Sequence, residues 1–397
     1  MLDTENAPAA AVPTVTTGRR GCRDILMNGR ALAFVVVVLL GFSGCHTNRI
    51  SEPTIGDALS LSGNVEAYGQ RALKGIKAAE EVAKQQPGVT PPRLLVQDAG
   101  STPPNAITAI KKLISDGAKV VIGDVSSGTS LVMAPIANKS HVLFLAPGAS
   151  SPKMRGIGQY IFRNWASDDF DGTAMANYLI NQKITTTAII NQQTDYSEGL
   201  ADAFEAVFKK FGGTVIIREK FFSDISDPRP LLVRVSSRSP KNIYIVAESQ
   251  QLGALLPQAR SRLPGSRFFA NLSVDTPECA KLAGTAREGI VFTTPAFDPD
   301  NLQNQQLRQF VSTYKRLNGD TPDIVAGTAY DAYMILATGI QTVGYDAEKL
   351  AAYLRTLKRF PGVTGQTSFD ETGDVVKNVF VKEIRNGQPT LLKEFTY

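Results

Sequence analysis

The strongest constraint on the fold is a regular alternation of short apolar segments and longer amphipathic segments from residue 54 onward. Residues 142–146, for example, are continuously apolar, whereas residues 68–84 place apolar side chains three and four positions apart. The first pattern is typical of a strand and the second of a helix. Continuously apolar strands that alternate with helices predict parallel sheets with helices on both faces.

Two series of this kind follow each other along the chain. The first contains strand-like segments at 54–60, 94–97, 119–123 and 142–146. The second begins after Asp168 and contains strand-like segments at 187–191, 215–220, 243–247, 267–270 and 289–293. Each series predicts one doubly wound sheet.

Three helix-like segments in a row then occupy 302–317, 323–342 and 347–358, before a glycine-punctuated, β-rich tail at 365–397. Helices without intervening strands do not extend a sheet, so we expect them to return to the first one. The predicted fold class is α/β, with two Rossmann-like doubly wound lobes joined by a multi-strand hinge. We assign residues 54–166 and 295–370 to the N-terminal lobe, and residues 167–294 and 371–397 to the C-terminal lobe.

Length and composition agree with this organisation. The chain has 397 residues, enough for two domains at about 150 residues each. It is 43% hydrophobic and 20% charged, as expected for an ordinary globular protein. The net charge of +5 comes from scattered basic residues. A basic face for nucleic acid is therefore not indicated, and we expect no nucleic-acid partner.

The N-terminus has the pattern of an export signal. Basic residues at 19, 20, 23 and 30 precede an apolar run at 31–42, which is shorter than the about 20 residues that span a bilayer. Residues 1–45 are therefore predicted to be a signal peptide, and residues 46–53 a linker. The final Ser43-Gly44-Cys45 resembles a bacterial lipobox, although Phe42 departs from its usual Leu, Val or Ile.

The lipobox resemblance implies a lipid on Cys45, and a protein of the periplasm or cell envelope anchored to the membrane. An uncleaved anchor helix is the alternative, and it would tether the chain to the same face of the membrane. Of the three cysteines, only Cys279 would then remain as a thiol, which leaves no disulfide.

Motifs of catalysis were not found. The chain contains no GxSxG, Walker, HExxH, GxGxxG or CxxC pattern, and it has only two histidines. We therefore predict no enzyme activity, no cofactor and no metal site. The aspartates at 168, 169 and 171 are interpreted as caps of a helix at a solvated crossover, and Arg155 as a surface residue.

Two loops are candidate ligand contacts, because parallel α/β sheets bind ligands outside the carboxyl ends of their strands. The first loop, residues 123–130, contains Ser126 and Ser127 at a helix start, where hydroxyl and N–H groups either cap the helix or hold an anionic group. The second loop, residues 146–151, is built of small residues that allow close approach of its backbone.

Four segments, beginning at Ser60, Leu94, Thr194 and Gly327, together resemble the leucine/isoleucine/valine-binding type of periplasmic binding protein in order and spacing. The first segment reads SLSGNVEAYGQRALKGIKAAEEV, and the second begins LLVQDAGSTPPNAITAI and continues to LAPGASSP. The third reads TDYSEGLADAFEAVFKKFGG, and the fourth reads GTAYDAYMILATGI. The resemblance implies a monomeric receptor that captures a small polar solute, such as an amino acid or amide, between two lobes. It also implies delivery to an ABC permease in the inner membrane. A sensing or regulatory domain of the same fold is the alternative.

The resemblance also implies site residues. The hydroxyl of Ser127 and the backbone and hydroxyl groups of Gly148 and Ser150 would hold the carboxylate and ammonium of an amino acid. Tyr68 and Tyr196 match aromatic residues that line the cleft.

Two positions leave alternatives open. The family's acid for the ligand's ammonium falls near Leu272 and is missing, so Glu248 or Asp275 would replace it, and we prefer Glu248 at the end of a strand. Trp165, at the first crossover, either stacks on the ligand or packs the hinge.

Overall fold

Strand β1 (Thr54–Leu59) lies inside the first sheet, and all but its first residue are buried. In the computed structural model, which describes residues 52–86, 90–301 and 303–397, this sheet has the order β2-β1-β3-β4-β5 and is parallel throughout. Its other strands are β2 (Arg93–Asp98), β3 (Val120–Ile122), β4 (Leu143–Ala146) and β5 (Ile161–Arg163). The short helical turn η1 (Pro152–Met154) stands between β4 and β5.

Helices cover both faces of this sheet because successive strand residues point to opposite sides. Ile55 and Ile122 share a core with α2 (Glu66–Lys84), whereas Ala58 and Val121 share a core with α3 (Pro103–Ser115) and α4 (Ser127–Lys139). The continuously apolar strands of the sequence are thus buried on both sides.

The second sheet has the order β14-β13-β10-β9-β8-β6-β7. Five strands are parallel: β6 (Thr186–Gln192), β7 (Thr214–Phe221), β8 (Asn242–Val246), β9 (Arg267–Asn271) and β10 (Val291–Pro295). The hairpin of β13 (Val379–Arg385) and β14 (Gln388–Phe395) adds two antiparallel strands beside β10.

Two helix layers enclose this second sheet as well. One core holds residues of α5 (Asp168–Asn181) and α6 (Asp195–Lys210). The other holds residues of α7 (Arg229–Ser236), α8 (Ser249–Arg262) and α9 (Pro277–Ala283). The short turns η2 (Leu272–Asp275) and η3 (Gly284–Arg287) flank α9.

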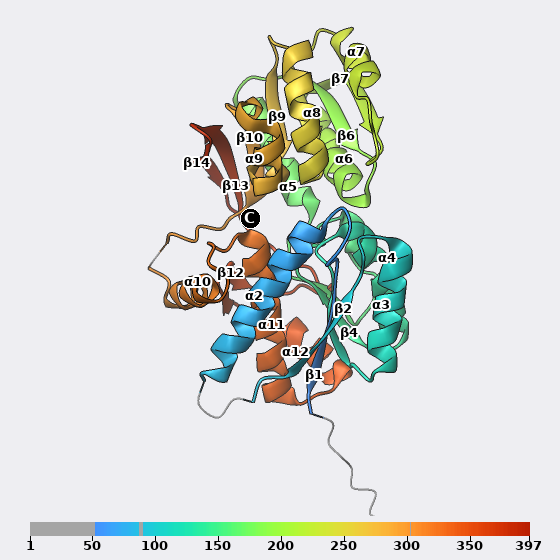
Figure 1. Cartoon of the computed structure of the whole chain (residues 1–397), viewed down its shortest axis with the longest axis vertical. Coiled ribbons are helices and arrows are strands. Elements are labelled where there is room, and N and C mark those ends of the chain that lie inside the picture. The colour runs from blue at the N-terminus through green and yellow to red at the C-terminus, as the bar shows by residue number, and fades with distance from the viewer. Residues whose placement is uncertain (1–51, 87–89, 302) are drawn as a thin grey trace, which may run out of the picture. The chain divides into compact units, whose positions relative to one another are not determined.

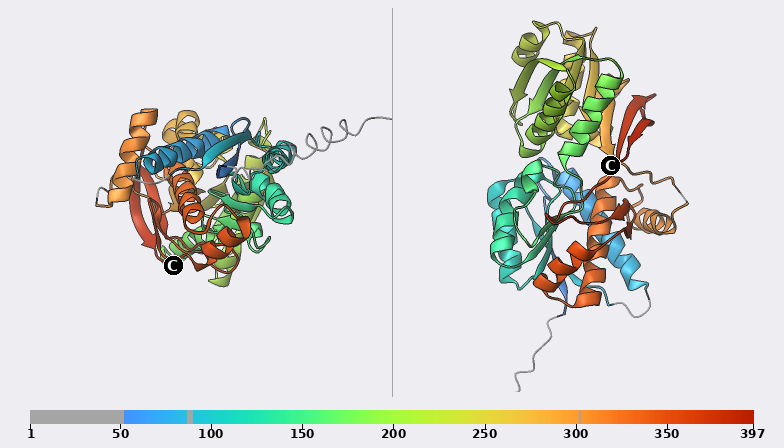
Figure 2. Two further views of the ribbon diagram at one scale, coloured as in Figure 1. Left: turned by 90° about the horizontal axis from the view of Figure 1, so that it is seen from below. Right: turned by 180° about the vertical axis from the view of Figure 1, so that it is seen from behind.

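The three consecutive helices α10 (Gln305–Asn318), α11 (Ile324–Val343) and α12 (Ala347–Thr356) share a core with β1 and β3 (Figure 1). Helix α11 packs on α2 so closely that a Cβ at Gly75 would lie 2.1 Å from the Ala326 carbonyl oxygen. The small sheet of β11 (Phe360–Gly362) and β12 (Gly365–Thr367) follows. Figure 2 shows α11 and α12, in orange, by the first sheet and the red β13–β14 hairpin by the second.

The chain therefore passes between the two sheets three times: from β5 to α5, from β10 to α10, and from β12 to β13. Such multi-segment connections allow two lobes to open and close about a hinge. In the part of the chain that the structure describes, no helix is long and apolar enough to cross a membrane. The predicted signal peptide and Cys45 lie outside the described residues.

Candidate functional site

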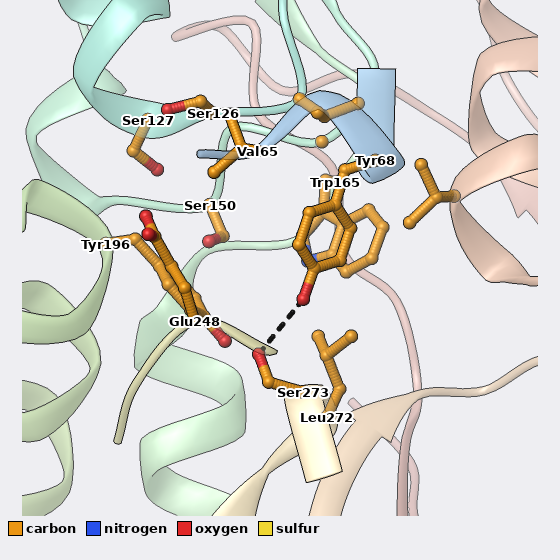
Figure 3. A pocket seen from close by; sticks show the side chains of 13 residues that line it. Val65, Tyr68, Ser126, Ser127, Ser150, Trp165, Tyr196, Glu248, Leu272 and Ser273 are labelled. Carbon is orange, nitrogen blue, oxygen red and sulfur yellow. Dashed lines mark hydrogen bonds between the residues drawn. The ribbon is translucent and has the colours of Figure 1, made fainter. Parts of the chain in front are cut away.

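A pocket lies where loops after strands of both sheets meet, and its cavity volume is about 70 Å³. The first lobe contributes Val65, Tyr68, Val125, Ser126, Ser127, Gly148, Ser150, Trp165 and Val325. The second contributes Tyr196, Glu248, Leu272 and Ser273 (Figure 3).

All eight residues that we expected to contact a ligand line this one pocket: Tyr68, Ser126, Ser127, Gly148, Ser150, Trp165, Tyr196 and Glu248. They come from six separate places along the chain, so the fold has brought them together. Their contacts with a ligand remain predictions. Asp275, the second candidate acid, lines a neighbouring cavity with Arg71 instead.

The start of α4 forms the polar end of the pocket. Ser126 is the residue before the first helical turn, and its side chain makes no capping hydrogen bond. The hydroxyl of Ser127, which is buried, accepts a hydrogen bond from the Ser151 amide at 3.1 Å. From the sequence, these hydroxyls could either cap the helix or contact a ligand. The structure shows that neither side chain caps the helix.

Asp124 holds this turn in place from inside the protein. Its carboxylate accepts hydrogen bonds from the Ser60 amide at 3.0 Å, the Val125 amide at 2.8 Å and the Thr129 hydroxyl at 2.6 Å. Burial raises the pKa of Asp124, and these donors oppose the shift. The loop before α4 is therefore a firm wall of the pocket.

The loop after β4 lies directly against the loop before α4. A Cβ at Gly148 would lie 2.9 Å from the Cα of Val125, so a larger residue there would push the two loops apart. The carbonyl oxygen of Ser150 accepts a hydrogen bond from the Asp168 amide at 2.9 Å. In Figure 3 the hydroxyls of Ser127 and Ser150 point into the pocket.

Aromatic side chains form a second wall. The Tyr68 hydroxyl contacts the Ser249 hydroxyl and lies 3.2 Å from the Ser273 hydroxyl, shown as a dashed line in Figure 3. The Tyr196 hydroxyl accepts a hydrogen bond from the side-chain nitrogen of Asn271 at 2.9 Å. Burial raises the pKa of Tyr68 to about 12, so its hydroxyl stays protonated at neutral pH.

Trp165 lies between the candidate site and the hinge, and its stacking on a ligand stays a prediction. It is 5% exposed, and it lines the candidate site on one side and a hinge cavity on the other. The hinge cavity also contains Phe297 and Lys377, from the second and third chain crossings. Trp165 therefore separates the pocket from the hinge.

Glu248 is the acid that reaches the pocket from the second lobe. Its amide donates to the Gln192 side-chain oxygen at 2.8 Å, and the Gln192 side-chain nitrogen donates to one Glu248 carboxylate oxygen at 3.1 Å. Burial raises the pKa of Glu248, and the Gln192 hydrogen bond opposes that shift. A cation in the pocket would favour its ionised form.

Asp168 was misjudged from the sequence. We expected a solvated aspartate that caps a helix, but Asp168 is fully buried as the first residue of α5, and Ser167 provides the cap by accepting from the Asp169 amide at 3.4 Å. Neither carboxylate oxygen of Asp168 has a hydrogen-bond partner within the described residues. Burial raises the pKa of Asp168 far above its usual value, and nearby Asp171 adds to the shift.

Asp168 thus stands behind the pocket wall beside Ser150 and was missed as a candidate. Its position directly after the first crossover was the sequence feature that could have indicated a place near the pocket. Arg155, expected at the surface, is half exposed and does not line the pocket. Among the described residues, no three His, Cys, Asp or Glu side chains are placed to hold a metal ion.

Two helix-covered sheets, one parallel and one mostly parallel, three chain crossings and a pocket lined from both sheets define a two-lobed solute-binding protein. The chain belongs to the periplasmic binding protein family, whose profile matches residues 52–389. The family resemblance and the α/β two-lobed fold class predicted from the sequence are confirmed.

Individual relatives narrow the comparison. The chain is 28% identical over 350 residues to a leucine-, isoleucine-, valine-, threonine- and alanine-binding protein of Pseudomonas aeruginosa, covering 86% of this chain and 92% of the relative. It is 26% identical to a Leu/Ile/Val-binding protein of Rhizobium johnstonii, covering 82% and 90%. The crystal structure of a leucine-binding protein from Thermotoga maritima superimposes with a TM-score of 0.79 at 29% identity, covering 87% and 99%.

Proposed function

We propose that this protein captures a small polar solute, an amino acid or a related amide, and delivers it to an ABC permease in the inner membrane. The observation that carries the proposal is the convergence of the Ser127 and Ser150 hydroxyls with the Glu248 carboxylate in one pocket lined by both lobes. An amino acid has the matching pair of charges.

The carboxylate end of the solute is assigned to the start of α4. The first N–H groups of a helix carry partial positive charge and lack helical partners, so they favour an anion. The side chain of Ser126 does not satisfy them, and the hydroxyls of Ser127 and Ser150 stand beside them. The backbone of Gly148 completes this end of the site.

The ammonium end is assigned to Glu248. Tyr196 borders the same side of the pocket. Leu272 occupies the position where the family resemblance expects an acid. Glu248 therefore replaces that acid from a neighbouring strand end.

The side chain of the solute would contact an apolar wall. Val65, Val125, Leu272 and Val325 line the pocket together with Trp165. Such a wall suits an aliphatic side chain, in agreement with the relatives named for leucine, isoleucine and valine.

Contacts between the lobes support closure around the solute. Besides Tyr68 and Ser273, Arg71 of α2 pairs with Glu278 of α9 at 2.5 Å, and Lys153 of η1 pairs with Asp195 of α6 at 2.7 Å. A solute could enter or leave only if contacts of this kind separate. A sensing domain would use the same closure, and a permease or sensor gene beside this one would distinguish the two roles.

Residues 1–45 place this activity outside the cytoplasm in our proposal, with a lipid on Cys45 as the anchor. The domain boundaries at 166/167, 294/295 and 370/371 belong to the same proposal.

A thermal-shift screen of purified protein against amino acids, amides and other small carboxylates tests the proposed function. Aliphatic amino acids should raise the melting temperature most, because a ligand that binds only the folded state stabilises it by mass action. A panel without a single stabilising solute would argue against the proposal.

A further inference from the structure

Arg163, at the end of β5, is buried at 1% exposure and does not line the pocket. Its guanidinium makes four hydrogen bonds in two directions. Nε and Nη2 donate to the two carboxylate oxygens of Asp374 at 2.7 and 2.6 Å. Nη1 donates to the carbonyl oxygens of Ser150 at 2.9 Å and Ser151 at 2.8 Å.

Asp374 belongs to the third chain crossing, between β12 and β13, and its side chain is 7% exposed. The backbone joins the same two segments, since the Arg163 amide donates to the Gly373 carbonyl at 3.0 Å. Gly373 has φ +83°, and a Cβ there would lie 2.2 Å from the Ile161 carbonyl oxygen. This close approach fixes the crossing against the end of β5.

A buried ion pair is costly unless its hydrogen bonds are well made, and the planar fork of arginine matches a carboxylate in two-point contact. Here the fork satisfies Asp374 on one side and leaves Nη1 for two carbonyl oxygens on the other. A lysine has one charged nitrogen, so it cannot reach both sets of acceptors with the same geometry.

The loop held by Nη1 is the one that we assign to the ligand's carboxylate. Arg163 sets the position of the Ser150 and Ser151 peptides, and the Ser151 amide in turn donates to the Ser127 hydroxyl at 3.1 Å. The two serines of the proposed anion site are therefore connected to the hinge through one side chain.

We infer that Arg163 and Asp374 form a positioning pair that holds the ligand-binding loop in its binding geometry and couples that loop to the third hinge crossing. Arg163 orients the loop, and Asp374 orients Arg163. The effect of the pair on affinity rests on the proposed function, whereas its effect on the loop does not require any ligand.

The first test uses hydrogen exchange of the ligand-free protein over residues 147–154. Asp374→Asn keeps the size of the side chain and removes its charge, and Arg163→Lys keeps the charge and removes the fork. Arg155→Gln is the matched control, because Arg155 is half exposed and its guanidinium donates to Asp374 at 3.0 Å. Within the part of the chain that the structure describes, its side chain makes no hydrogen bond to residues 147–154. We expect about tenfold faster exchange of the Ser151 amide in the first two variants and less than about twofold change in the control.

The second test measures affinity for L-leucine. Asp374→Asn and Ser150→Ala should each weaken binding by about tenfold. Their combination should weaken it by much less than the product of the two, because Ser150 contributes little once its loop is displaced. A purely structural pair would lower the melting temperature but leave loop exchange and affinity as in the wild type.

Unchanged exchange over residues 147–154 in Asp374→Asn would overturn the inference, and so would strictly multiplicative losses of affinity. If Asp374→Asn does not fold, Arg163→Lys provides the same comparisons. Faster exchange in both variants, together with a wild-type protein that binds no amino acid, would support the positioning pair and overturn the proposed amino-acid ligand.

Discussion

The hydroxyl of Tyr68 in α2 lies 3.2 Å from the hydroxyl of Ser273 in η2, and this contact joins the two lobes beside the pocket. Tyr68→Phe removes this contact and the one with the Ser249 hydroxyl, without changing the apolar wall. Because a neutral hydrogen bond contributes about 0.5–1.5 kcal/mol, we expect the dissociation constant for the solute to rise by about twofold to tenfold.

Calorimetric titration measures this loss, with Tyr345→Phe as the control. The Tyr345 hydroxyl also makes a hydrogen bond, from the Lys119 amide at 3.0 Å, but Tyr345 does not line the pocket. Equal affinities in all three proteins would show that the Tyr68 contact does not stabilise the closed form.

The two ion pairs between the lobes should differ in strength. Arg71 and Glu278 are 15% and 27% exposed, whereas Lys153 and Asp195 are 63% and 38% exposed. Exposed pairs contribute about 0–1 kcal/mol and are screened by salt. We therefore expect Arg71→Gln to weaken solute binding by about tenfold and Lys153→Gln by less than about threefold. A larger effect of Lys153→Gln than of Arg71→Gln would contradict this ranking.

Stability should depend on pH through Asp171. Burial raises the pKa of Asp171 to about 7 in the folded protein, whereas an unfolded aspartate titrates near about 4. Between these values the folded state binds more protons than the unfolded state, so the free energy of unfolding should fall as pH rises from about 4 to about 7. Asp171→Asn should reduce this fall by about 1–3 kcal/mol.

Urea unfolding at several pH values measures the dependence. Asp169→Asn, a half-exposed neighbour in the same helical turn, is the control for the loss of one charge. A pH dependence that is identical in wild type and Asp171→Asn would place the titrating group elsewhere.

Most of the element order and the loops of the pocket were accessible from the sequence because both depend on local patterns, but the short elements β5 and α9 were not predicted. Apolar runs alternating with helical spacing predict sheets, and the loops containing Ser127 and Ser150 follow strands whose carboxyl ends meet. The burial of Asp168 was not accessible, because an aspartate after a strand has the same local pattern whether it faces solvent or a second lobe. The pairing of Arg163 with Asp374 spans 211 residues, and nothing in either local sequence indicates the other.

Cys45 gives a prediction about the part of the chain before the described residues. If the lipobox is processed, the mature protein begins at Cys45, carries lipid and partitions into detergent. Cys45→Ala should leave the precursor uncleaved or release the protein. Intact-mass measurement would contradict the proposal if the wild-type protein carries no lipid and begins at another residue.

The central claim is that Ser127 and Ser150 hold a solute's carboxylate, and calorimetric titration with L-leucine and other amino acids tests it most directly. A charge-assisted hydrogen bond contributes about 1.5–3 kcal/mol, so Ser127→Ala and Ser150→Ala should each weaken binding by about tenfold to a hundredfold. Ser130→Ala, in the same helix but outside the pocket, should bind as the wild type does. One-to-one binding by the wild type with these losses is the predicted result. Wild-type affinity in both Ser127→Ala and Ser150→Ala, or no binding of any amino acid by the wild type, would contradict the account.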